Sequence, residues 1–179
     1  GSFCVPEEFR FKMNFYVTKD FSGWKNMVIF GNSDSERNLL IALYSRNRLQ
    51  VVSSTAKEWN AECNIENIKI ELNKLYTITV TRTSSSLKAQ FELGSCENEN
   101  IGPVKFAGQQ KELYLGNPFA LGRELNYYTS VHEFTPKLQV KCAPPPPQNF
   151  QHIGKSKKLG SFCVPEEFRF KMNFYLTED

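Results

Sequence analysis

Apolar and polar residues alternate along most of the first 142 residues of the chain. The clearest example is FRFKMNFYV at residues 9–17, where every second residue is apolar. A period of two is that of a β-strand with one buried and one solvated face. The same pattern recurs, between segments rich in turn-forming residues, at 27–31, 38–45, 48–54, 65–72, 76–82, 87–93, 112–116 and 130–141. Eight to twelve short strands with these spacings predict an all-β fold, an antiparallel two-sheet sandwich of the jelly-roll type.

The chain contains an internal repeat, because residues 1–20 return at 160–179. The two segments differ only at Val17/Leu176 and Lys19/Glu178, so eighteen of twenty positions are identical. This predicts one full period of a tandem repeat and the opening of a second; the alternative is an artificially duplicated terminus. Four prolines at 144–147 favour an extended polyproline II linker. We therefore predict a sandwich domain at 1–142, a proline-rich linker at 143–159 and the start of the next repeat at 160–179.

The cysteines suggest disulfides once the repeat is taken into account. Cys163 repeats Cys4, so each period carries four cysteines, enough for two bridges, with buried free thiols as the alternative. None has the C-x-x-C spacing of zinc or thioredoxin-like sites. Disulfides favour an oxidising compartment, so we expect an extracellular or cell-surface protein. The four cysteines of the first period are Cys4, Cys63, Cys96 and Cys142.

Charge and hydropathy argue against two classes of partner. The net charge is only +3, and no basic stripe interleaves with aromatic residues, so nucleic acid is not expected. No apolar run approaches the roughly 18 residues of a membrane-spanning helix, so no membrane span is expected.

Four segments in order resemble the laminin G family. They are NLLIALYSRNRLQVVSS (38–54), LYTITVTRTSSSLKAQFELGSC (75–96), KELYLGNP (111–118) and FTPKLQVKC (134–142). The cysteine after the second segment is similar to the thrombospondin N-terminal-like branch of that family. The chain departs from the family pattern at Leu75-Tyr76, where Trp-His is usual, and at Ser95, where Asp precedes the cysteine.

The resemblance implies a fold, a disulfide pairing and a metal. The fold is a concanavalin A-like sandwich over most of residues 3–142. The pairing is Cys96–Cys142, which leaves Cys4–Cys63 as the second bridge. Family members often hold calcium on the sandwich rim with aspartates from two loops, and Asp34 is the candidate ligand here. No second aspartate occurs in the other rim loops, so we prefer an Asx turn at Asp34 and expect no cofactor.

Candidate catalytic groups are few. Glu97 and Glu99 have the i, i+2 spacing of a carboxylate pair, but their polar surroundings favour a solvated turn. His132 and His152 have no cysteine or serine partner in a recognisable context. We therefore do not expect an enzyme.

Glycan binding has two candidate residues, Trp24 and Trp59, which occur in polar, turn-like segments. An exposed tryptophan can stack on a sugar, although a half-buried tryptophan that caps the core is commoner. A heparin-binding patch is a further option, with solvated charge as the alternative; its members would be Arg46, Arg48, Lys57, Lys155, Lys157 and Lys158.

The favoured hypothesis is a non-enzymatic structural protein, a repeating unit of an extracellular fibre or matrix whose partners are copies of itself. The repeated strand would pair within the next unit or occupy the first-strand slot of a neighbour, as a donor strand. The alternative hypothesis is a lectin-like module that binds extracellular glycans, and a glycan-active enzyme is less favoured. The predicted assembly residues are Phe162, Val164, Phe168, Phe170, Met172, Phe174 and Leu176.

Overall fold

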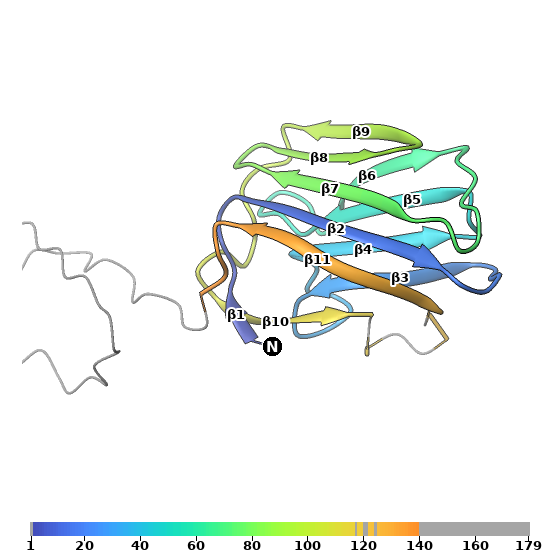
Figure 1. The fold of residues 1–179 in the computed structure, drawn as a ribbon. Helices are drawn as coiled ribbons and strands as arrows, with labels where there is room; N and C mark the ends of the chain where they lie inside the picture. Colours follow the sequence, from blue (N-terminus) through green and yellow to red (C-terminus); the bar gives the residue numbers. More distant parts are fainter. Residues whose placement is uncertain (1, 117, 120–121, 124, 140–179) are drawn as a thin grey trace, which may run out of the picture. The chain divides into compact units, whose positions relative to one another are not determined.

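The structure is a computed structural model that describes residues 2–116, 118–119, 122–123 and 125–139. These residues form eleven strands in two antiparallel sheets packed face to face, which confirms the predicted all-β sandwich (Figure 1). Among them no helix is long and apolar enough to cross a membrane. The proline-rich linker, the second copy at 160–179, Cys142 and Cys163 lie outside the described residues.

One sheet has six strands and the other five. The six-stranded sheet has the order β1-β10-β3-β4-β5-β6, and the five-stranded sheet the order β11-β2-β7-β8-β9. The six-stranded sheet contains β1 (Ser2–Cys4), β10 (Gln110–Leu115), β3 (Trp24–Phe30), β4 (Leu39–Tyr44), β5 (Arg48–Ser53) and β6 (Ala61–Glu66). The five-stranded sheet contains β11 (Tyr127–Thr135), β2 (Phe9–Val17), β7 (Tyr76–Arg82), β8 (Ser86–Phe91) and β9 (Gly94–Glu99).

The core lies between the sheets and is built from the alternating positions. In β2 the five apolar residues are all buried, and the residues between them are exposed or half-buried. β3 and β4 contain continuous buried runs because their outer face also packs against apolar neighbours. This smaller outer cluster contains Ile29, Leu40 and Val52, with Tyr114 packed against it.

The observed disulfide corrects the predicted pairing. Cys63 of β6 is bonded to Cys96 of β9, so the Cys96–Cys142 and Cys4–Cys63 bridges are wrong. β6 and β9 are edge strands of different sheets on the same side of the sandwich, which brings these two cysteines together. Cys4 also takes part in a disulfide, as predicted.

Two predicted strands differ most from the observed ones. The strand predicted at 9–17 has the bounds of β2, and Ser2–Cys4 forms the additional strand β1 in the other sheet. The strand predicted at 65–72 ends at Glu66 because Asn67 has a positive φ of 57°. The strand predicted at 130–141 starts at Tyr127 and ends at Thr135, before Pro136. The turn predicted around Cys96 is instead the edge strand β9.

A buried arginine closes one end of the sandwich. Arg82 is 1% exposed and follows Tyr76, Ile78 and Val80 on the inner face of β7. Its guanidinium donates to Ser53 Oγ of the other sheet at 3.2 Å and to the carbonyl of Gly102 at 2.5 Å. Burial lowers the pKa of Arg82 to about 10, so the side chain remains charged at neutral pH.

Candidate functional site

A row of four side chains crosses the outer face of the six-stranded sheet. Trp24 of β3 is registered opposite Tyr44 of β4, Tyr44 opposite Arg48 of β5, and Arg48 opposite Glu66 of β6. Directly opposed residues of an antiparallel pair project from the same face of a sheet. Tyr44, Arg48 and Glu66 are the chain neighbours of core residues, so they point away from the core. The row therefore lies on the outer surface.

Aromatic and charged groups are in contact along this row. The rings of Trp24 and Tyr44 have centroids 5.0 Å apart and are tilted by 54°. The guanidinium carbon of Arg48 lies 5.9 Å from the centroid of the Trp24 ring, within the range of a cation–π contact. Arg48 Nη2 lies 2.6 Å from Glu66 Oε1, so the two formal charges offset each other.

A cavity of about 390 Å³ opens at this row, and its lining also includes Asn47 and Asn67. The backbone fixes both asparagines. Ile68 N donates to the carbonyl of Asn47 at 3.1 Å, which ties the β4–β5 turn to the chain after β6. Asn67 occupies the left-handed region, which asparagine tolerates better than most residues. Two side-chain amides are thus held at the rim by local backbone geometry.

The next row across the same strands consists of Asn26, Ala42, Gln50 and Asn64. Two buried amide atoms in this row, Asn26 Nδ2 and Asn64 Oδ1, have no hydrogen-bond partner among the described residues. Buried polar atoms are normally hydrogen-bonded because desolvation without a partner costs about 1–3 kcal/mol. The row beside the cavity thus holds hydrogen-bonding capacity that the fold does not use.

This arrangement suits a particular kind of ligand. Two aromatic rings offer an apolar surface, while a guanidinium, a carboxylate and two amides offer donors and acceptors at one rim. The Arg48–Glu66 pair carries no net charge. The cavity therefore favours an uncharged molecule with an apolar face and several hydroxyl groups over an ion.

The second tryptophan, Trp59, lies outside this cavity, and a lysine side chain contacts its ring. Trp59 is 47% exposed, in the segment between β5 and β6. Lys105 Nζ lies 4.6 Å from the centroid of its ring. Trp59 does not line the Trp24 cavity. The structure thus separates the two predicted candidates, and of the two it is Trp24 that lines the cavity described above.

Asp34 is engaged by an arginine. Its carboxylate Oδ2 accepts a hydrogen bond from Arg37 Nη2 at 3.0 Å, and its carbonyl accepts from Arg37 Nε at 2.6 Å. A guanidinium at this distance opposes the binding of a cation. Within the described part of the chain, no three His, Cys, Asp or Glu side chains are grouped to hold a metal ion.

The candidate catalytic residues lie on exposed strands. Glu97 and Glu99 project from the outer face of β9, and Glu97 pairs with Lys88 at 3.0 Å. His132 has a serine partner that sequence reasoning missed, because Ser130 Oγ lies 3.0 Å from His132 Nε2 on β11. Both residues are exposed, and neither lines the Trp24 cavity.

The basic residues of the proposed heparin patch make separate local contacts. Arg46 pairs with Asp20 at 2.8 Å, Arg48 pairs with Glu66, and Lys57 donates to the carbonyl of Asn100 at 3.3 Å. Two of the three described members are therefore neutralised by carboxylates. The linker lysines lie outside the described residues.

Comparison with known proteins supports the fold alone. No protein-family model matches the chain, and no curated protein matches it. Among solved structures, the chain is similar to the CBM40 of the Ruminococcus gnavus IT-sialidase bound to α2,3 sialyllactose. That similarity has a TM-score of 0.53 and 9% identity, over 72% of this chain and 76% of the other. The same CBM40 bound to α2,6 sialyllactose gives a TM-score of 0.52 and 8% identity, over 72% and 77%. The chain therefore shares the β-sandwich fold of these two structures.

Proposed function

We propose that this domain is a non-catalytic module that binds a glycan at the Trp24 cavity. The observation that carries the proposal is the cross-strand row in which Trp24 and Tyr44 adjoin Arg48 and Glu66. Sugars present an apolar face of C–H groups and a rim of hydroxyls. An aromatic side chain can cover the first while amides and charged groups bond to the second.

The charge balance of the cavity indicates the class of glycan. Arg48 is held by Glu66 at 2.6 Å, so an acidic sugar would have to compete with that carboxylate. A neutral sugar gains hydrogen bonds from both groups without separating them. We therefore propose a neutral oligosaccharide as the ligand. The two similar CBM40 structures hold sialyllactose, an acidic glycan, and their likeness to this chain is in fold only.

An extracellular or cell-surface location fits this function. The Cys63–Cys96 bridge and the disulfide at Cys4 are typical of an oxidising compartment. Exposed glycans are abundant there, so a disulfide-bonded binding module would meet its ligand.

The test is a comparison of two tryptophan variants. The purified chain is screened on an array of neutral and acidic glycans, and the best ligand is titrated by calorimetry. Trp24→Ala is expected to weaken binding about tenfold or more, because it removes the aromatic surface of the cavity. Trp59→Ala is the matched control and is expected to leave the affinity unchanged.

Two results would contradict the proposal. One is the absence of binding to any glycan by the wild-type chain. The other is equal affinity of the wild-type and Trp24→Ala chains when both show the same thermal unfolding. Binding of acidic glycans alone would reject the proposed ligand class while retaining the site.

A second candidate function rests on the sequence repeat. Eighteen identical positions of twenty and a proline-rich segment before the second copy support a tandem array, as in a matrix protein. Membership of the laminin G family belongs to the same proposal. Electron microscopy of the native material tests it, because regularly spaced beads longer than one domain are expected, and isolated globules would exclude a fibre.

A further inference from the structure

One side of the sandwich leaves inward-facing apolar residues exposed. Leu115 of β10 is registered opposite Val28, and Val131 of β11 is registered opposite Met13. Val28 and Met13 are completely buried core residues, so Leu115 and Val131 project from the inner faces of their sheets. They are nevertheless 55% and 43% exposed. The core is therefore incompletely covered where β10 and β11 meet the solvent.

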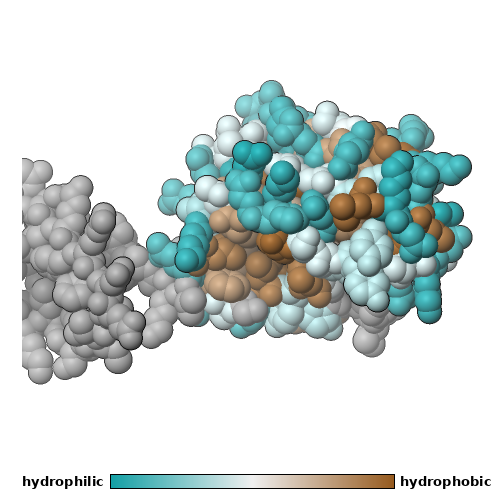
Figure 2. Space-filling view, viewed as in Figure 1, coloured by the Kyte–Doolittle hydropathy of each residue, from teal (hydrophilic) through white to brown (hydrophobic). Residues whose placement is uncertain are grey.

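The apolar surface extends beyond these two residues. In Figure 2 hydrophobic residues gather on the viewed face beside β11, on the side where Figure 1 shows β1 and β10. Phe3 and Leu113 from these strands, and Phe134 from β11, are only partly buried against the core. Exposed contiguous apolar surface on a soluble domain commonly marks an interaction site.

An unpaired backbone edge borders the same surface. β11 is the edge of the five-stranded sheet, and β2 is the one strand that pairs with it among the described residues. Such an edge is a template for a further strand. The six-stranded sheet has one strand more than its partner sheet, so an added strand beside β11 would lie opposite β1, next to β10.

We propose that this open edge takes up residues 168–176 of a second copy of this chain as an added, antiparallel strand. The segment reads FRFKMNFYL and is nine residues long, the length of β11. It repeats the alternation of β2, which forms a strand whose apolar residues are all buried. Its inward residues, Phe170, Met172 and Phe174, would cover the exposed side chains of β10 and β11.

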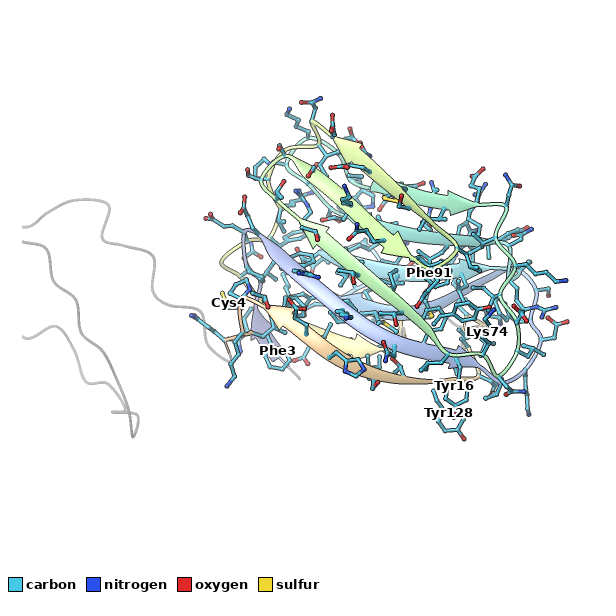
Figure 3. All side chains as sticks on the ribbon, turned by 45° about the horizontal axis from the view of Figure 1, so that its top comes forward. Phe3, Cys4, Tyr16, Lys74, Phe91 and Tyr128 are labelled. Carbon is cyan, nitrogen blue, oxygen red and sulfur yellow. A yellow bond between two sulfur atoms is a disulfide. The ribbon has the colours of Figure 1, made fainter. Side chains whose placement is uncertain are left out.

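The observed pairing of β2 with β11 supports this partner. Arg10 of β2 lies 3.8 Å from Glu133 of β11, and the rings of Tyr16 and Tyr128 stack with centroids 5.0 Å apart. Figure 3 shows Tyr16 and Tyr128 side by side, pointing away from the sandwich. Tyr128 remains 62% exposed. Arg169 and Tyr175, which repeat Arg10 and Tyr16, would approach Glu133 and Tyr128 from the second edge of β11.

The observed fold also corrects the slot that the sequence suggested. The first-strand slot of the five-stranded sheet is filled by the domain's own β2, between β11 and β7. Exchange into that slot would require β2 to leave a strand pair on each side. Addition at the edge of β11 requires no such opening. Four consecutive prolines at 144–147 favour an extended linker, and such a linker favours pairing between chains over folding back.

The test measures self-association of the 179-residue chain by sedimentation velocity over a range of micromolar concentrations. Concentration-dependent association is expected for the wild type. Phe170→Lys is expected to weaken it about tenfold or more, because a lysine would be placed on the inward face. Asn173→Lys adds the same charge to the outward face and is the matched control. Both substitutions lie outside β2, so the domain keeps its own strands.

A second pair of variants tests the acceptor edge. Val131→Lys on the inward face of β11 is expected to weaken association to the same extent. The matched control, Ser130→Lys on the outward face, is expected to associate like the wild type. Glycan binding at Trp24 is on a different surface, so Trp24→Ala should leave self-association unchanged. This control separates failure of this inference from failure of the proposed function.

Three outcomes would overturn the inference. The first is a wild-type chain that stays monomeric. The second is association that survives Phe170→Lys, including association through disulfide-linked chains detected by non-reducing electrophoresis. The third is association that is lost in Phe170→Lys but kept in Val131→Lys, because the strand would then bind at a place other than the edge of β11.

Discussion

The two sides of the sandwich differ in how they protect the core from water. On one side the edge strands β6 and β9 are joined by the Cys63–Cys96 disulfide, and Asn98 Nδ2 donates to the carbonyl of Glu62 at 2.9 Å. On the other side Cys4 of the edge strand β1 is also disulfide-bonded, and its backbone N donates to the carbonyl of Gln139, after β11, at 2.7 Å, but inward-facing residues of β10 and β11 remain exposed. We call the first the closed side and the second the open side.

Inward-facing residues are less exposed on the closed side than on the open side. Ile65 of β6 and Phe91 of β8, near the closed side, are 4% and 8% exposed. Leu115 and Val131 on the open side are 55% and 43% exposed. The two sides of the sandwich therefore differ in how completely they bury their inward-facing residues. The open side keeps apolar surface available for contact with another strand.

The largest expected effect is the loss of the link on the closed side. The two cysteines are 33 residues apart in the sequence, and closing a loop of this length stabilises a fold by about 3–4 kcal/mol in the chain-entropy description. The double variant Cys63→Ala, Cys96→Ala is expected to lose that amount in urea unfolding at neutral pH. Peptide mapping should show that Cys4 is still disulfide-bonded. A loss below about 1 kcal/mol would mean that packing alone closes this side.

A matched pair of leucines tests the difference between the sides directly. Leu49 of β5 is completely buried and Leu115 of β10 is 55% exposed, although both face inward. Leu49→Ala is expected to reduce the free energy of unfolding by about 3 kcal/mol. Leu115→Ala is expected to reduce it by about 1 kcal/mol or less, because most of the side chain is already in water.

The unfolding measurements for this pair need a monomeric background. The Phe170→Lys chain provides it, since association would otherwise add to the stability of the wild type at high concentration. Equal losses for the two leucines would contradict the description of the β10–β11 side as open.

Much of the fold could be predicted from the alternation of apolar and polar residues. This pattern identifies strands with one buried face, and it fails for edge strands with few apolar residues. The predicted strand at 76–82 has the bounds of β7, because one of its faces is buried and the other is solvated. The sequence predicts a turn where β9 lies, because the outer positions hold Ser95, Glu97 and Glu99; an edge strand needs few apolar residues. Arg82 occupies the inward phase of β7, so the alternation itself held a signal that this arginine is buried.

The candidate site was harder to predict because it depends on register. Tyr44 and Arg48 flank the turn S-R-N, so their direct opposition could be read from the sequence. That Trp24 and Glu66 join the same row could not be predicted from the sequence, because β3 has a bulge between Asn26 and Val28. The disulfide pairing failed for a similar reason. It depends on which two edge strands face each other across the sandwich.

The next prediction concerns a polar contact at the open side. Lys111 occupies an inward position of β10, is 7% exposed and lies 2.9 Å from Glu36 Oε2. Burial alone would raise the pKa of Glu36, but hydrogen bonds from Lys111 and from the backbone of Asn32, with the lysine charge, lower it from its ordinary 4.5. The folded state therefore binds the Glu36 proton less readily than the unfolded state does.

The sign of the pH dependence follows from this lowered pKa. The stabilisation from the ionised Glu36 carboxylate is fully present above the pKa of Glu36 in the unfolded state. It is lost as the pH falls through the pKa of Glu36 in the folded state. Glu36→Gln is expected to lose about 1 kcal/mol at neutral pH and to flatten the stability profile below about pH 4.5. Urea unfolding at several pH values measures both. An unchanged profile would show that other carboxylates account for the acid sensitivity of the domain.

The smallest expected effect concerns surface pairs on the two sides. Tyr16 and Tyr128 stack near the open side, and Lys88 pairs with Glu97 at 3.0 Å near the closed side. Double-mutant cycles with Tyr16→Thr and Tyr128→Thr should give a coupling of about 0.5–1 kcal/mol, since threonine keeps the strand propensity. The cycle with Lys88→Gln and Glu97→Gln should give about 0.5 kcal/mol or less, because an exposed ion pair is weak.

The tyrosine cycle also distinguishes stability from assembly. In the Phe170→Lys chain, the coupling reports only the stacking of Tyr16 on Tyr128 within the domain. In the wild-type chain at high concentration, an added strand would place Tyr175 beside Tyr128. The effect of Tyr128→Thr should then exceed its effect in the monomer, because association is lost as well. Identical effects in the two backgrounds would show that Tyr128 stabilises the domain alone, and that the open side has no partner at this end of β11.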